Sequence, residues 1–188
     1  MRVLFLCCLL VGSVCLHAED RSECKKRDSS SDQSWNPSSD AVTPDLRHFY
    51  GLGDKLEEAQ GSNDSAQIEK VAKEYLTAAE SYRCNWNYGN AVYDANSALG
   101  LAAIAKGDKK LAVKYLLESA KSPGSPQLDT FGPTMVLADK LVGAGEKDAV
   151  IGYLEGIRHF WRMDDGEVEK WIGQLRSGKK PDFRMQLQ

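Results

Sequence analysis

The sequence lacks the residue groupings that build common catalytic and metal sites. Only three histidines occur in 188 residues, and His48 and His159 are far apart in the chain. Neither belongs to a short metal-ligand spacing. No glycine-rich loop follows a strand-like segment in the way that phosphate sites require. We therefore predict no cofactor, no metal site and no enzyme activity.

A strong excess of charge of either sign is also missing. Lys and Arg number 24 and Asp and Glu number 27, for a formal net charge of -3. A nucleic-acid-binding domain usually carries a basic patch, so we predict no nucleic-acid partner. The hydrophobic share of 42% and charged share of 27% are typical of a globular domain with a real core.

The one long apolar run lies at the N-terminus. Arg2 precedes an apolar stretch over Val3–Leu16, and Ala18 then offers a small residue before a charged segment. This order is typical of a secretory signal peptide, here residues 1–18. The run is short for a bilayer span of ~20 residues, although an uncleaved anchor is the alternative. We predict an exported protein, periplasmic or secreted, with no stable membrane span after signal cleavage.

Cysteines are few once that segment is set aside. Only Cys24 and Cys84 remain beyond residue 18, an even pair that an oxidising compartment would favour joining. A disulfide between them would close a loop of about 60 residues and stabilise the fold by roughly 4 kcal/mol. The alternative is two separate thiols.

Composition divides the chain into segments. Residues 19–44 are polar and rich in serine, and they lack the apolar side chains needed to offset ordering entropy. We predict a disordered tether there, a helical domain over 45–177 and a frayed basic tail over 178–188.

Apolar residues recur at helical spacing through the domain, and no strand-like alternation competes with them. Thr43-Pro44-Asp45 is typical of a helix start. Glycine- or proline-containing segments then separate the expected helices. These breaks lie near residues 61–65, 106–108, 122–133 and 143–146, with a polar-aromatic connector at 84–90. The pattern predicts an all-α fold of antiparallel helical hairpins.

The stretch from Ala98 to Leu117 resembles a tetratricopeptide repeat. That family has Leu-Gly inside its first helix, Gly-Asp at the turn and Ala in its second helix. Leu99-Gly100, Gly107-Asp108 and Ala112 match in order and spacing. Gly100 and Ala112 would allow the two helices of the hairpin to approach closely, and Gly107 would permit a left-handed turn.

The layout recurs around Gly145, about 38 residues after Gly107, whereas the family period is about 34. The 122–133 loop would hold the extra residues. The resemblance implies a short right-handed solenoid of stacked hairpins, with a hairpin at 91–121 and a second at 134–162. A helical bundle without repeats is the alternative.

Solenoids of this kind use a concave face to bind partners. On the best repeat that face would carry Asp94, Ser97, Leu101 and Ala105. Some tetratricopeptide proteins hold a peptide carboxylate there with Lys, Asn and Arg. Because those residue types are missing, an apolar or extended peptide would suit this face better.

The connector offers a second candidate contact surface. Trp86 and Tyr88 lie among Asn85, Asn87 and Asn90, and large aromatics recur at binding hot spots. The alternative is a plug that fills the space between hairpins.

Together these features predict an exported scaffold that binds a protein or peptide partner. One alternative is an exported enzyme on a helical fold that uses carboxylates or His159 with Asp164, which requires those groups to converge in a pocket. Another is a structural subunit of a cell-envelope complex, with an apolar end near Trp171 covered by a neighbour.

Overall fold

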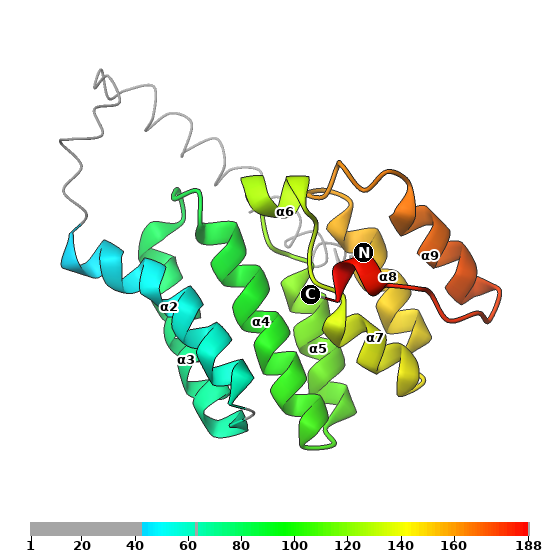
Figure 1. Ribbon diagram of the computed structural model, residues 1–188, viewed down its shortest axis with the longest axis horizontal. Helices are drawn as coiled ribbons and strands as arrows, with labels where there is room; N and C mark the ends of the chain where they lie inside the picture. The colour runs from blue at the N-terminus through cyan, green and yellow to red at the C-terminus, as the bar shows by residue number, and fades with distance from the viewer. Residues whose placement is uncertain (1–42, 63, 188) are drawn as a thin grey trace, which may run out of the picture. The chain divides into compact units, whose positions relative to one another are not determined.

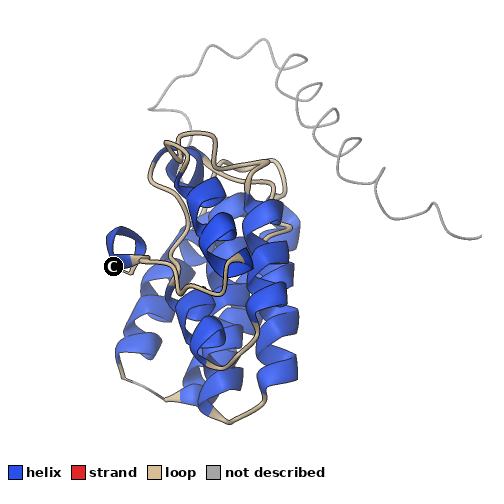
Figure 2. Cartoon of the chain, turned by 90° about the vertical axis from the view of Figure 1, so that its right-hand side faces the viewer, coloured by secondary structure: helices blue, strands red, loops and turns tan. Residues whose placement is uncertain are grey.

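The computed structural model describes residues 43–62 and 64–187. Within these ranges every regular element is a helix, and no strand occurs (Figure 2), which confirms the all-α prediction. The helices are α2 (Pro44–Gly61), α3 (Ser65–Ala79), α4 (Tyr88–Ala105), α5 (Lys109–Ser119), α6 (Pro126–Thr130), α7 (Val136–Gly143), α8 (Lys147–Ile157) and α9 (Glu167–Arg176). Short 3₁₀ turns occur at Glu80–Tyr82 and Arg184–Gln186.

Helix starts follow the capping residues of the sequence. The Thr43 hydroxyl accepts a hydrogen bond from the Leu46 amide at 3.2 Å, with Pro44 in the first turn. Asp64 accepts from the amides of Ala66 and Gln67 at 3.0 and 3.2 Å at the start of α3. These side chains satisfy amides that a helix start otherwise leaves unpaired.

Two of the helical turns have the same backbone geometry. Gly107 and Gly145 have φ values of 81° and 93°. In each turn the following residue donates an amide hydrogen bond back to the end of the preceding helix. Asp108 donates to the Ala103 carbonyl at 3.0 Å, and Glu146 donates to the Leu141 carbonyl at 2.9 Å. The left-handed turn predicted at Gly107 is therefore confirmed, and it recurs between α7 and α8.

Helices α2 through α5 pack on one another in sequence order, as Figure 1 shows. Both α7 and α8 contact α5, α7 also contacts α4, and α9 packs on α8. The core forms two clusters, one among α2, α3 and α4 and one from α4 to the C-terminal segment. α4 contributes to both clusters, so it is the central element of this packing.

The close approach expected at Gly100 has a different partner. We predicted that Gly100 would bring α4 close to α5. Instead, a Cβ at Gly100 would lie 2.3 Å from Cδ2 of Leu137 on α7. The missing side chain therefore makes room for the next hairpin, while Ala112 is fully buried as a small core residue.

Two local predictions need correction. The connector is shorter than expected, because α4 begins at Tyr88 and already contains Asn90. The 122–133 loop includes the short helix α6, which starts at Pro126 with Ser125 as its capping residue. Proline in the first turn and a serine cap are sufficient to start one helical turn.

The prediction of a frayed tail over residues 178–188 is wrong for the part that the structure describes. Phe183 is buried and its ring meets Trp171 edge-on at 4.9 Å between ring centroids. The Met135 amide donates to the Gln186 carbonyl at 2.7 Å, and Lys180 pairs with Asp139 at 2.7 Å. One buried aromatic and these polar contacts are enough to hold the segment through Leu187 against the domain.

Several predictions concern the N-terminal part of the chain. The signal peptide and the tether before Thr43 lie outside the described residues, and so does Cys24. Cys84 is disulfide-bonded, and its pairing with Cys24 stays a prediction. None of the helices described is both long enough and apolar enough for a membrane span.

Candidate functional site

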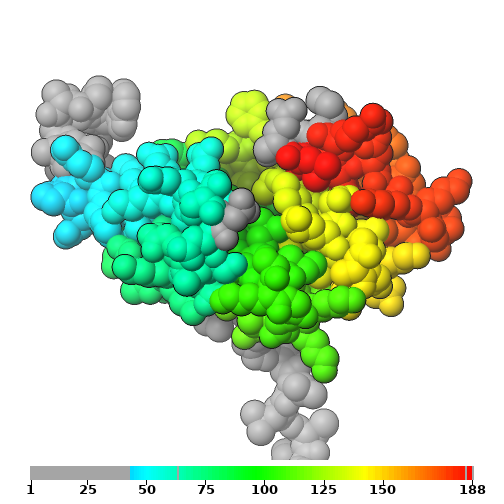
Figure 3. All heavy atoms as spheres, turned by 60° about the horizontal axis from the view of Figure 1, so that its bottom comes forward, coloured from blue at the N-terminus to red at the C-terminus, as the bar shows by residue number. Residues whose placement is uncertain are grey.

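A groove runs across the face where α2, α4 and α7 meet. Its volume is about 1020 Å³, and each of these helices contributes a stripe of residues to it. In the space-filling view of Figure 3, the cyan α2 and the yellow α7 lie on either side of the green α4. The start of α3 also contributes Ser65 and Ile68, so the groove is built from four helices of the chain.

The stripe on α4 contains the residues predicted for the inner face. Asp94, Ser97, Leu101 and Ala105 all line the groove. Their spacing of three, four and four residues keeps them on one side of a helix. Ser97 is buried in the floor, Leu101 is half-buried, and Asp94 and Ala105 are exposed. The structure thus brings these four positions together along a single surface.

Asp94 is unusual among the charged residues of this groove, because its carboxyl group is desolvated. Water reaches its side chain, yet the walls of the groove surround the carboxyl and remove much of its solvation. This desolvation raises the pKa of Asp94 from 3.8 to about 7. No ion pair or hydrogen bond joins the Asp94 carboxyl to another of the described residues. An ionised Asp94 therefore lacks the compensation that carboxylates in partly enclosed sites usually have.

Two further charges lie in the same groove. Glu57 comes from α2 and Lys140 from α7, and both are exposed. Neither forms an ion pair with another described residue. The groove therefore presents two carboxyl groups and one ammonium group between apolar side chains such as Leu101, Ile104 and Val136.

A buried pair of tyrosines fixes the floor beneath these residues. The Tyr93 hydroxyl donates to the Thr134 carbonyl at 2.6 Å and accepts from the Tyr153 hydroxyl at 2.8 Å. Burial raises the pKa of both tyrosines well above the usual value, so both phenols are neutral at physiological pH. The contacts join α4 to α8 and to Thr134, which itself lines the groove. They make the groove a preformed feature of the packing.

The three other predicted site residues lie elsewhere. Trp86, Tyr88 and Asn90 do not line the groove. Trp86 is 53% exposed, and its ring lies 5.8 Å from the ring of Tyr50 on α2. Trp86 therefore does not fill a gap in the core, but it does cover part of α2.

The asparagines of the connector form a hydrogen-bonded network. Asn85 donates to the Tyr50 hydroxyl at 2.9 Å, and Asn87 donates to the Tyr75 hydroxyl at 3.0 Å. Asn90 donates to the Asn87 side chain at 2.9 Å. Burial raises the pKa of Tyr75 to about 12 despite the hydrogen bond from Asn87. This network fastens the start of α4 to α2 and α3.

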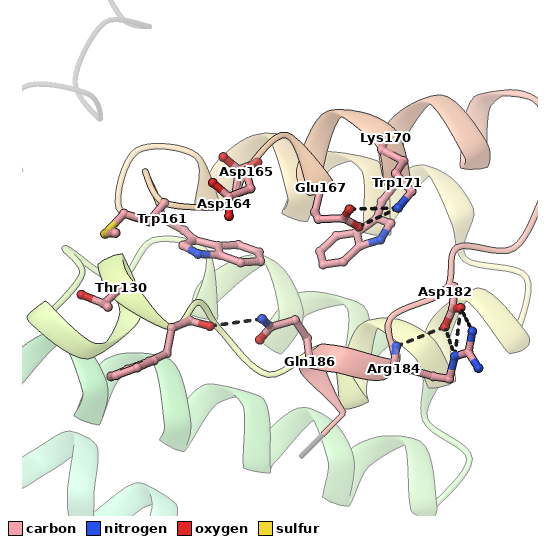
Figure 4. Close-up of a pocket in the computed structure, with 12 residues that line it drawn as sticks. Thr130, Trp161, Asp164, Asp165, Glu167, Lys170, Trp171, Asp182, Arg184 and Gln186 are labelled. Atoms are coloured by element: carbon pink, nitrogen blue, oxygen red, sulfur yellow. Dashed lines mark hydrogen bonds and ion pairs between the residues drawn. The ribbon is translucent and has the colours of Figure 1, made fainter.

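A second pocket, of about 650 Å³, lies between the loop after α8, the start of α9 and the C-terminal segment (Figure 4). Its cations already have carboxylate partners. Lys170 pairs with Glu167 at 2.9 Å, and Arg184 pairs with Asp182 at 2.5 Å. Its indoles, Trp161 and Trp171, are almost fully buried. The cations of this pocket are thus paired within the protein, whereas the buried indole N–H groups of Trp161 and Trp171 have no hydrogen-bond partner among the described residues.

The histidine and acid that the enzyme alternative invoked have separate contacts. His159 Nδ1 lies 2.6 Å from the Gly156 carbonyl, and Nε2 lies 2.7 Å from the Ser122 carbonyl. Asp164 accepts from the Val168 amide at the start of α9. No hydrogen bond or ion pair joins His159 to Asp164. Within the described ranges, no group of three or more metal-ligand side chains comes together.

Comparisons with known proteins identify no relative. No protein-family model, curated protein or solved structure matches the chain.

Proposed function

We propose that this protein is an exported, tetratricopeptide-like scaffold that binds a peptide segment of a partner protein in the groove of α2, α4 and α7. The observation that carries the proposal is the shape and lining of that groove. An apolar channel with a few unpaired polar groups is the usual form of a recognition site. Its volume of about 1020 Å³ lies at the upper end of the range for small-ligand pockets, which favours an extended peptide.

The helical arrangement supports the likeness to tetratricopeptide repeats. The α4–α5 and α7–α8 hairpins have the same glycine turn, at Gly107 and Gly145. The first helix of each hairpin lines the groove, and so do α2, the first helix of the preceding hairpin, and the first turn of α3. Stacked hairpins present a shared inner face in this way.

Two features support export. Residues 1–18 have the composition of a signal peptide. Cys84 is disulfide-bonded, and disulfides persist mainly in oxidising compartments such as the periplasm or the extracellular space. The proposed scaffold would therefore meet its partner outside the cytoplasm.

A peptide-display selection against the purified protein tests the proposal. Peptides enriched from a random library should bind the wild type with micromolar or better affinity, measured by fluorescence anisotropy. Leu101→Glu places a charge in the groove and should weaken their binding at least about tenfold, which corresponds to about 1.4 kcal/mol.

Leu111→Glu is the matched control. Leu111 lies on α5, outside the groove, and it is 37% exposed. The same substitution there should leave peptide affinity within about twofold of the wild type. Failure to enrich any peptide, or equal loss from both variants, would refute binding in the groove. The enzyme and structural-subunit alternatives predict these negative results.

A further inference from the structure

We propose that the bound segment carries a lysine or arginine side chain next to apolar residues, and that Asp94 forms an ion pair with this basic group. The inference rests on the peptide binding proposed above and assigns the chemical class of the peptide.

The first argument is that Asp94 lacks a cation that comparable carboxylates have. Asp129 is held by Arg162, which lowers the pKa of Asp129 through hydrogen bonds. Glu69 contacts Lys106 and Lys73, and its pKa is lowered as well. Among the described residues Asp94 has no such neighbour, and its pKa moves in the opposite direction. Asp94 is therefore available for a cation that a ligand supplies.

The second argument concerns what happens when a ligand covers the groove. Binding displaces water from the Asp94 carboxyl and would increase its desolvation. A neutral or acidic peptide would add to this desolvation cost, because it leaves the carboxylate enclosed without a counter-charge. A basic side chain supplies the counter-charge and forms a charge-assisted hydrogen bond. Asp94 therefore selects for basic peptides and against the others.

The third argument uses the spacing along α4. Leu101 follows Asp94 by about two helical turns, or roughly 10 Å along the helix axis. An extended peptide advances roughly 3.3 Å per residue. A peptide that runs along α4 can thus place a basic side chain at Asp94 and an apolar side chain at Leu101 when the two are about three residues apart.

The other charges in the groove are less suited to this role. Glu57 lies on α2 and is exposed, as Asp94 is, but the groove walls remove much of the solvation of the Asp94 carboxyl. Lys140 would favour an acidic group, but the groove has two carboxyl groups and only this one ammonium group. The excess of carboxyl groups over ammonium groups in the groove therefore favours a basic peptide.

A double-mutant cycle on a selected peptide tests the pairing. The selection should enrich lysine or arginine about three positions from an apolar residue. The best peptide would then be compared with a version in which norleucine replaces its basic residue, on the wild type and on Asp94→Asn. Asp94→Asn should weaken the basic peptide about tenfold and change the norleucine peptide less than about twofold.

Two further variants sharpen the cycle. Glu57→Gln removes a neighbouring carboxyl group and should change the affinity less than about threefold. Asp94→Lys should reverse the preference, so that a version of the peptide with glutamate at the basic position binds better than the original.

The outcomes separate this inference from the proposed function. Peptides that bind with no basic preference, lose affinity with Leu101→Glu and ignore Asp94→Asn would overturn the pairing but keep the peptide groove. No peptide binding at all would overturn both. A concentration-dependent dimer that Leu101→Glu dissociates would show a second copy in the groove. Binding that appears only after removal of residues 19–42 would show the chain's own segment there. Either result would overturn a separate basic partner.

Discussion

The groove and the connector that leads into α4 at residues 84–87 differ in how their polar side chains are satisfied. Both regions involve α4, and both were predicted as contact surfaces. In the connector, Asn85 and Asn87 donate to the hydroxyls of Tyr50 and Tyr75. In the groove, the Asp94 carboxyl is desolvated and has no partner among the described residues.

This difference separates a structural joint from a binding site. Polar groups that are paired within the protein contribute to its stability, and a ligand would have to break their hydrogen bonds. Polar groups that remain unpaired in a concave surface can be satisfied only by water or a ligand. Changes in the connector should therefore reduce stability, and changes in the groove should alter binding.

The largest loss of stability is expected for Gly89→Ala at the start of α4. A Cβ at this position would lie 1.9 Å from the Gly124 carbonyl oxygen, a backbone atom that cannot move aside freely. We expect the free energy of unfolding in a urea titration to fall by about 2–3 kcal/mol. Gly51→Ala on α2 is the control, because nothing lies within 4 Å of its Cβ. It should be neutral or stabilise by up to about 1 kcal/mol. Equal effects would contradict the close backbone contact.

Asn87→Ala should have the next largest effect. It leaves the buried Tyr75 hydroxyl without its hydrogen-bond donor. The free energy of unfolding should fall by about 1–3 kcal/mol. Adding Tyr75→Phe removes the orphaned hydroxyl, so the double variant should lose less than the sum of the two single losses. Strict additivity would show that the connector network is not the joint described above.

Asp94→Asn should raise the free energy of unfolding, whereas the two preceding variants lower it. The gain should appear at neutral and higher pH. The folded-state pKa of about 7 exceeds the usual 3.8. Ionisation of Asp94 therefore destabilises the fold fully above pH 7, and this penalty declines as the pH falls and is lost below 3.8. The variant should gain on the order of 1 kcal/mol at pH 8, since water that reaches the carboxyl screens the effect, and almost nothing at pH 3, below both pKa values.

Thermal unfolding at the two pH values measures this difference. Glu57, Lys140 and Tyr75 also face this region, so Glu57→Gln and Lys140→Gln serve as controls. Neither control should reproduce the pH dependence. A gain from Asp94→Asn that is equal at pH 8 and pH 3 would show that desolvation is not its cause.

Trp86→Ala should have the smallest effect. The indole is about half exposed, and its ring lies 5.8 Å from the ring of Tyr50. We expect a loss of less than about 1 kcal/mol in urea unfolding and a change in peptide affinity below about twofold. If Trp86→Ala strongly weakened peptide binding while the fold stayed unchanged, the connector rather than the groove would be the binding surface.

The sequence was most informative where a feature depends on one helix or one turn. Helical spacing predicted that Asp94, Ser97, Leu101 and Ala105 share a face, and the glycine turn at Gly107 was predicted from backbone sterics. These features need only local geometry. The Thr43 cap belongs to the same class.

Features that depend on how helices stack were not predicted. The stripe on α2, including Leu56 and Glu57, has clear helical spacing, but nothing local indicates that it faces α4 and α7. Gly100 contacts α7 rather than α5 for the same reason, since its partner lies about 37 residues away. The C-terminal segment was predicted to fray because its composition is basic, whereas the burial of Phe183 determines its place.

One measurement tests the central distinction between groove and connector most directly. Amide chemical shifts of the isotope-labelled protein would be followed while the best basic peptide is added. We predict that the largest shifts cluster on the groove stripes of α2, α4 and α7, around Asp94 and Leu101, and that the connector amides barely move. Shifts centred on Trp86 and Tyr88, with the groove unchanged, would contradict the account.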